Sequence, residues 1–170
     1  MLKALLFLSK TIIVIMRYNI KDILDIGPRC IERFIDSQTL AQIPNLEALA
    51  GCSNLSGRYC VARSAPLEHT LFYTLAGQGK LTTQNEQYTL NANTLIVLPA
   101  KQSFEVKIDA EHWDVIWLNL ANTKRWQHLN LAEALVLTDQ KLEPLHLAME
   151  LLYSEPNAKL CESVMPILSH

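Results

Sequence analysis

The sequence has 170 residues, of which 49% are apolar and 19% are charged, and its formal net charge is −2. This length corresponds to about one domain with a buried core. So little excess charge gives no stripe of lysines and arginines, on which nucleic-acid affinity depends, and we expect no direct binding to nucleic acid. The cysteines lack the two-residue spacing of zinc or redox sites, which favours buried thiols in a reducing, cytoplasmic compartment; they are Cys30, Cys52, Cys60 and Cys161.

Residues 1–16 form an apolar N-terminal extension. Ser9 and Lys10 interrupt it, so its longest uncharged run is shorter than the ~20 apolar residues that cross a bilayer. No small-residue cleavage site follows the run, and we expect neither a secretory signal nor a membrane contact. Met16, which precedes Arg17, is an alternative start, and residues 1–15 are then an upstream extension of the true reading frame.

Residues 17–51 are predicted to form a helical or irregular arm. In IKDILDI and CIERFI, apolar residues recur three and four apart, and the breaker Gly27-Pro28 separates the two segments. LEALAG then ends on Gly51, a signal that typically stops a helix.

Residues 52–122 change to a period of two, with short runs spaced as in an all-β barrel. We expect a tight reversal at residues 76–79, where two glycines permit positive φ, and turns at Gln84-Asn85, at residues 91–93 and at residues 99–102. In HWDVIWLNL, alternation places Trp113, Val115, Trp117 and Asn119 on one face and the intervening residues on the other.

Residues 123–170 return to a helical period and are predicted to be a dimerisation region. One helix carries an apolar stripe, and Pro144 suits its first turn. The stripe either packs back on the barrel of its own chain or pairs with a second copy; it consists of Leu142, Leu145, Met149 and Leu152. A second helix follows over residues 159–170, shortened or kinked by Pro166.

This organisation resembles the N-terminal sensor domain of AraC/XylS-family transcription regulators. The matching segments are Ala50-Gly51, RYCVAR, LFYTLAGQGKL, QYTLNANTLIVLPA and WDVIWLNL, which cover most of residues 50–120. The resemblance implies a mainly β fold with flanking helices: a cupin-like β-barrel (double-stranded β-helix) followed by two C-terminal helices. It also implies a homodimer that responds to a small organic effector. In that family a helix-turn-helix region carries the DNA binding, and it would begin near His170, where this sequence stops.

The resemblance to cupins does not extend to their metal ligands. Metal-binding cupins keep glycine, proline, glycine and histidine where this sequence has Asn93, Pro99, Lys101 and Phe104. A phenyl ring offers no lone pair to a cation, and His69 stands without the second histidine of the first cupin motif. We therefore expect neither a metal nor another cofactor, and no catalytic residues.

The candidate ligand-binding residues are Arg63, Tyr73, Phe104, Trp113 and Trp117. Trp117 stands where arabinose-binding members of the family have a sugar-stacking tryptophan, and its indole N–H is free to donate a hydrogen bond if the face points inward. Arg63 falls within one residue of their sugar-contacting arginine, and a guanidinium forms bidentate hydrogen bonds with a hydroxyl or carboxylate. The alternatives are a tryptophan that only fills the core and an arginine at a strand edge facing water.

Two of these patterns bear on the class of ligand and of function. Val106 and Val115 occupy positions that are polar in the arabinose sensors, so an effector more apolar than arabinose is expected. A sensor and dimerisation domain without its own DNA-binding region is the favoured interpretation. A small metal-dependent cupin enzyme and a non-functional truncated remnant remain as alternatives.

Overall fold

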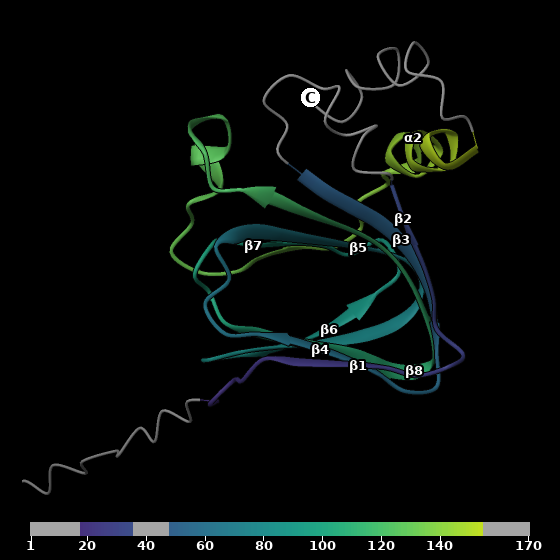
Figure 1. Cartoon of the computed structure of the whole chain (residues 1–170), viewed down its shortest axis with the longest axis horizontal. Coiled ribbons are helices and arrows are strands. Elements are labelled where there is room, and N and C mark those ends of the chain that lie inside the picture. The colour runs from purple at the N-terminus through teal and green to yellow at the C-terminus, as the bar shows by residue number, and fades with distance from the viewer. Residues whose placement is uncertain (1–17, 36–47, 155–170) are drawn as a thin grey trace, which may run out of the picture.

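The computed structural model describes residues 18–35 and 48–154 (Figure 1). The predictions about residues 1–16, the start at Met16 and the helix over residues 159–170 lie outside this range. Within it, nine strands form one antiparallel sheet: β1 (Ile23–Ile26), β2 (Ile31–Phe34), β3 (Ala48–Ser56), β4 (Tyr59–Arg63), β5 (Glu68–Thr83), β6 (Gln87–Asn91), β7 (Leu95–Leu98), β8 (Phe104–Ala121) and β9 (Leu135–Leu137).

The two longest strands, β5 and β8, are shared by two layers that fold over each other (Figure 1). Residues 68–77 of β5 pair with residues 113–121 of β8, whereas residues 79–83 pair with residues 104–108. The first half of β5 and the second half of β8 join β2, β3, β7 and β9 in one layer, and the second half of β5 and the first half of β8 join β1, β4 and β6 in the other. The result is the open, mainly β barrel that the sequence predicted.

The reversal predicted at residues 76–79 is wrong, because β5 continues through it as one strand. The register with β8 shifts between Thr74 and Ala76 and again between Gly77 and Gly79, which marks a bulge. Gly77 has φ +70°, and a Cβ at this position would lie 2.1 Å from the carbonyl oxygen of His112. The glycines therefore bend the strand into the second layer instead of ending it.

The helical pattern predicted for residues 17–51 is also wrong where the structure describes them. ILDI is strand β1, paired with β4, and IERF is strand β2, paired with β3. Residues 48–51 open β3. In strands of four residues, two apolar side chains three apart fit a helical period by chance, so local spacing does not separate the two structures.

Alternation along β8 is confirmed and creates two cores. Trp113, Val115 and Trp117 pack between the two layers. Ile116, at 0% exposure, and Leu118 face outward. The outward face is covered by the helix described next, so both sides of this part of the layer are buried.

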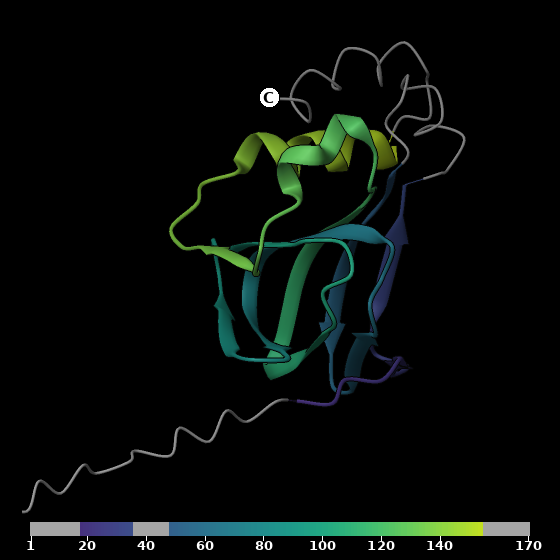
Figure 2. The same cartoon turned by 90° about the vertical axis from the view of Figure 1, so that its left-hand side faces the viewer.

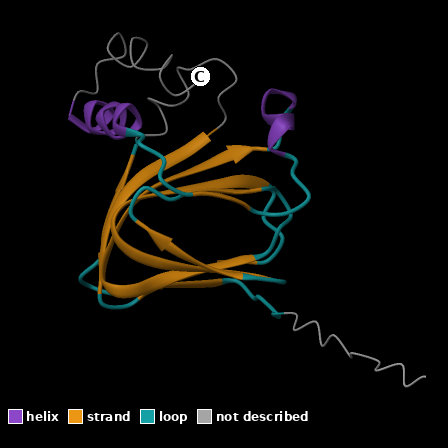
Figure 3. Cartoon of the chain, turned by 180° about the vertical axis from the view of Figure 1, so that it is seen from behind, coloured by secondary structure: helices purple, strands orange, loops and turns teal. Residues whose placement is uncertain are grey.

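Two helices lie outside the strands, as the view from behind shows (Figure 3). The 3₁₀-helix η1 (Lys124–Leu129) follows β8, and α2 (Glu143–Ser154) crosses above the layer that contains β3 (Figure 2). The predicted helix with Pro144 in its first turn is therefore confirmed. Among the residues described, no helix has the length and apolar character needed to span a membrane.

The predicted dimerisation stripe packs against its own chain. Met149 is fully buried against Ile116 and Cys52, and Leu142 and Leu145 are partly buried on the same cluster. The side chain of Leu152 lies outside what the structure describes. Of the two alternatives for this stripe, the intramolecular one accounts for these three residues.

The turns on either side of β7 keep a glycine-like backbone without glycine. Asn93 has φ 64° and Lys101 has φ 69°, at the two positions where metal-binding cupins keep glycine. Gln102 N–H donates to the Pro99 carbonyl at 3.2 Å, which closes the turn predicted there. The left-handed conformation costs a residue with a Cβ more than it costs glycine.

We predict that Lys101→Gly stabilises the protein. Relief of the left-handed strain outweighs the added entropy of the unfolded chain, for a net gain of ~0.5–1 kcal/mol in the free energy of unfolding. Urea denaturation measures the change. Lys101→Ala keeps the Cβ and serves as the control; an equal gain in Lys101→Ala would show that strain at this corner is not the cause.

Candidate functional site

A cavity of about 440 Å³ lies between the two layers of the barrel. Its walls come from β1 and β4 on one side and from β2, β3 and the start of β5 on the other. Most of the wall is apolar, and its side chains include Leu24, Ile26, Phe34, Leu49, Val61 and Phe72. The size and the apolar lining are those of small-molecule sites, which add a few placed polar groups for orientation.

Three of the five predicted ligand-binding residues, Arg63, Phe104 and Trp117, line this cavity. Tyr73 does not, because it points to the other face of its layer and is buried under α2. Its hydroxyl lies 3.0 Å from Asn93 Oδ1 and 2.9 Å from the Gln140 carbonyl, and accepts Leu142 N–H at 3.2 Å. Tyr73 thus holds the segment before α2 against the sheet.

Trp113 also lies outside the cavity lining. It is fully buried, and its indole N–H donates to Thr74 Oγ1 at 3.1 Å. A Cβ on Gly79 would lie 2.6 Å from its ring, so the bulge in β5 provides the room that the indole occupies. Of the alternatives weighed for the tryptophans, Trp113 fills the core.

Trp117 forms part of the cavity wall and lies directly across from Gly51 in the adjacent strand. A Cβ on Gly51 would approach the ring to 2.4 Å, and Phe34 packs edge-on against the ring at 5.3 Å between centroids. The indole N–H donates to Ser53 Oγ at 3.0 Å. The prediction that this N–H is free for a ligand is therefore wrong, and the ring offers a ligand its face and edge.

Phe104 and His69, the two positions compared with cupin ligands, have different environments. Phe104 is 2% exposed and packs edge-on against Phe72 at 5.9 Å between centroids. His69 is fully buried; Ala100 N–H donates to its Nδ1 at 3.0 Å, so the proton lies on Nε2, 3.3 Å from Asn122 Oδ1. Burial lowers the pKa of His69, in keeping with a neutral structural histidine. No three His, Cys, Asp or Glu residues of the described segments lie together as metal ligands would.

Five polar side chains in the wall were missed by the sequence analysis as ligand groups: Glu32, Tyr59, Glu68, Thr70 and Asn119. Thr70 Oγ1 donates to Asn119 Oδ1 at 2.9 Å. Glu32 Oε1 accepts the hydroxyl of Tyr59 at 3.4 Å, and burial together with this carboxylate raises the pKa of Tyr59. Alternation with Phe34 along β2 would have placed Glu32 in the wall, had that segment been recognised as a strand.

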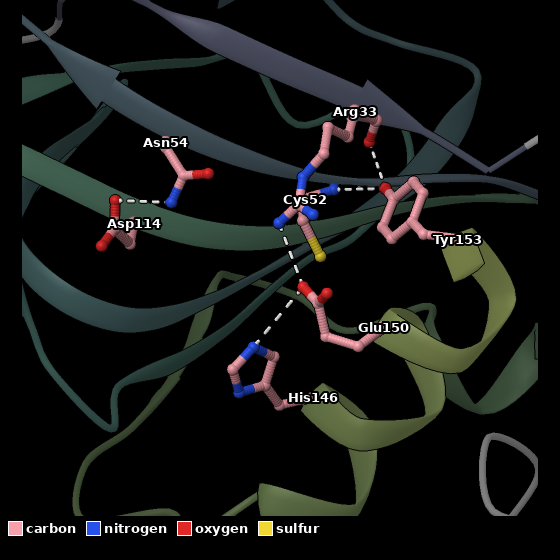
Figure 4. A network of polar contacts seen from close by, with 7 residues as sticks. All are labelled: Arg33, Cys52, Asn54, Asp114, His146, Glu150 and Tyr153. Atoms are coloured by element: carbon pink, nitrogen blue, oxygen red, sulfur yellow. Dashed lines mark hydrogen bonds and ion pairs between the residues drawn. The ribbon is translucent and has the colours of Figure 1, made fainter.

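The outer face of β2 and β3, away from the cavity, anchors α2 (Figure 4). Arg33, between the cavity residues Glu32 and Phe34, forms an ion pair with Glu150 at 3.0 Å. The Tyr153 hydroxyl accepts Cys52 N–H at 2.8 Å and donates to the Arg33 carbonyl, so it joins the two strands where they pair. Burial raises the pKa of the Cys52 thiol to about 11, which keeps it protonated and unreactive at neutral pH.

An open β-barrel of two layers around an apolar cavity, with helices outside, is the architecture of the cupin class. A cupin-superfamily protein of Desulfitobacterium hafniense superposes with a TM-score of 0.47 at 11% identity, over 59% of this chain and 84% of that one. YlbA of E. coli superposes with a TM-score of 0.52 at 10% identity, over 68% of this chain and 48% of that one.

The sequence model of the AraC-like ligand binding domain matches residues 55–162, and the chain belongs to this family. The Vibrio cholerae protein ToxT, solved with an unsaturated fatty acid bound, superposes with a TM-score of 0.49 at 16% identity, over 72% of this chain and 52% of ToxT. The chain thus spans about half the length of YlbA and of ToxT. No curated protein matches the sequence.

We predict that Gly51→Ala disturbs both the stability and the cavity. The added methyl group meets the Trp117 ring and the Arg33 carbonyl, and overpacking of this kind costs about 1–3 kcal/mol in the free energy of unfolding. Urea denaturation and tryptophan fluorescence measure the two effects.

A double-mutant cycle with Trp117→Phe isolates the contact with the indole. Part of the cost of Gly51→Ala should disappear when the larger ring is absent, because the residual contact is with the Arg33 carbonyl alone. Strict additivity of the two substitutions would contradict the steric explanation.

Proposed function

We propose that this chain is the effector-binding domain of an AraC-type transcription regulator and that the cavity between its layers holds a small organic effector. The observation that carries the proposal is the mostly apolar cavity of about 440 Å³ inside a domain of the AraC-like ligand-binding family. Arg63, Phe104 and Trp117 would contact the effector, and Tyr73 and Trp113 would support the walls from behind. A cytoplasmic location and DNA contact through another region remain predictions.

Binding without catalysis fits the residues present. The position compared with a cupin histidine is a phenyl ring packed on Phe72, which has no lone pair for a metal. Two hydroxyl groups in the wall are already engaged, because Thr70 donates to the amide oxygen of Asn119 and Tyr59 donates to the carboxylate of Glu32. These contacts suit recognition of a ligand better than activation of a nucleophile.

We predict that the cavity binds the uncharged apolar dye Nile red and that Val61→Trp abolishes the binding. Val61 lines the cavity, and an indole at this position fills it. Dye fluorescence titrated against protein measures the affinity. Leu135→Trp, which adds the same ring at a partly exposed leucine that does not line the cavity, is the matched control. Equal dye affinity in Val61→Trp and wild type would overturn the proposal.

We also propose that the chain forms a homodimer through the outer face of α2. The inner face packs on the sheet, so the stripe predicted from the sequence is already in use. Leu147, at 64% exposure, and Leu151, at 42%, lie four residues apart on the opposite face. Two exposed leucines one turn apart are the anchors by which an amphipathic helix packs against a second helix.

We predict that the double substitution Leu147→Glu/Leu151→Glu gives a monomer where the wild type is a dimer, because charges replace the apolar contact. Sedimentation measures the mass, and circular dichroism checks that the fold persists. Leu67→Glu, at a leucine 73% exposed and outside α2, should leave the dimer intact. A wild-type monomer, or a dimer that survives the double substitution, would contradict this surface.

A further inference from the structure

The cavity wall carries one positive and one negative side chain at separate positions, Arg63 and Glu32. Arg63 and Tyr59 lie four residues apart on β4 and both line the cavity. At the rise of a strand, their backbone positions are roughly 13 Å apart. Tyr59 donates to Glu32 at 3.4 Å, so the carboxylate lies beside Tyr59, four residues along β4 from Arg63.

The carboxylate of Glu32 is held in place but its charge is not compensated. Ser53 and Tyr59 donate their hydroxyls to the same oxygen, Oε1, at 3.5 and 3.4 Å. Trp117 N–H donates in turn to Ser53 Oγ at 3.0 Å, which fixes the group against the indole. The ion pairs of the described residues do not include Glu32. A carboxylate in an apolar wall is stabilised by a cation or by further donors.

Arg63 is the cationic counterpart of Glu32 in the cavity wall. Its Nη1 donates to the carbonyl of its neighbour Ala62 at 3.3 Å, and the ion pairs found in residues 18–35 and 48–154 do not include it. A guanidinium has five N–H donors in a planar fork that matches a carboxylate. Phe104 pairs with Arg63 across the strands and supplies an apolar wall beside it.

We propose, building on the effector-binding function above, that the effector is an elongated molecule with an acid at one end, an amine at the other and an apolar spacer between them. The acid pairs with Arg63 and the amine with Glu32, while Trp117 and Phe34 line the spacer. An effector with only an acid leaves the Glu32 charge without a partner, and the second acid in the wall, Glu68, adds to the negative charge. The cavity therefore discriminates against purely anionic amphiphiles.

Three eight-carbon probes test this assignment: octanoic acid, octylamine and ω-aminooctanoic acid. The backbone positions of Arg63 and Tyr59 are roughly 13 Å apart, and Glu32 lies beside Tyr59. Because the side chains of Arg63 and Glu32 shorten this span, a spacer of eight carbons suits it. Each probe displaces Nile red from the cavity below its critical micelle concentration. We expect ω-aminooctanoic acid to compete at least about tenfold better than either of the others, the size of a single well-formed ionic contact.

Two variants, each of which removes one charge from the cavity wall, identify which end of the effector each residue binds. Glu32→Gln keeps an oxygen for Ser53 and Tyr59 but removes the charge, so the amino acid should then compete no better than octanoic acid. Arg63→Met keeps an unbranched side chain but removes the guanidinium, and the amino acid should then compete no better than octylamine. Glu133→Gln, which removes a charge from an exposed residue that does not line the cavity, should preserve the preference and is the matched control.

The outcomes separate this inference from the function on which it rests. If Nile red binds the cavity and octanoic acid displaces it as well as the amino acid does, the bipolar effector is wrong while the binding site stands. The same holds if Glu32→Gln leaves the preference unchanged. If Nile red does not bind, or binds equally to Val61→Trp, it is the cavity as effector site that fails.

Discussion

The pairing of β5 with β8 is the constraint on which the rest of this structure depends. Both strands run through both layers, and the bulge at Gly77 and Gly79 bends them together, so one pair of strands produces two facing walls. The same glycines make room for Trp113, whose indole fills the bend. Arg63, at the end of β4, and Glu68, at the start of β5, line the cavity between these two walls.

The edge strand β2 and its neighbour β3 make different contacts on their two faces, because a strand alternates its side chains. Glu32 and Phe34 face the cavity, and Arg33 between them holds Glu150 of α2. The hydroxyl of Tyr153 spans the same strand pair. A molecule that moves β2 on one face must therefore disturb the anchoring of α2 on the other, since only the thickness of one strand separates them.

Sequence reasoning succeeded where one period ran over many residues. The nine residues of HWDVIWLNL have an unbroken alternation, which fixed the faces of Trp117 and Ile116, and the α2 stripe gave a helix in the right place. It failed for β1 and β2, four residues each, whose strand character comes from pairing with partners between 17 residues (Phe34–Gly51) and 39 residues (Ile23–Ala62) away. Glu32, which lies on β2, was therefore not recognised as a residue of the cavity wall. Tyr73 was misplaced because a β5 face was assigned without knowing which layer α2 would cover.

The position of β2 between the cavity and α2 does not by itself make the domain a ligand-dependent switch. A ligand shifts the anchoring of α2 only to the extent that it binds one position of β2 better than another. Phe34 and Leu24 are the wall residues with most exposed surface, at 53% and 66%, so they have the most to gain from being covered. Burial of apolar surface is worth about 25 cal/mol per Å². An effector that reaches both Arg63 and Glu32 would cover Phe34 as well, and its binding energy would favour one position of β2 over another only insofar as more of this ring is buried there.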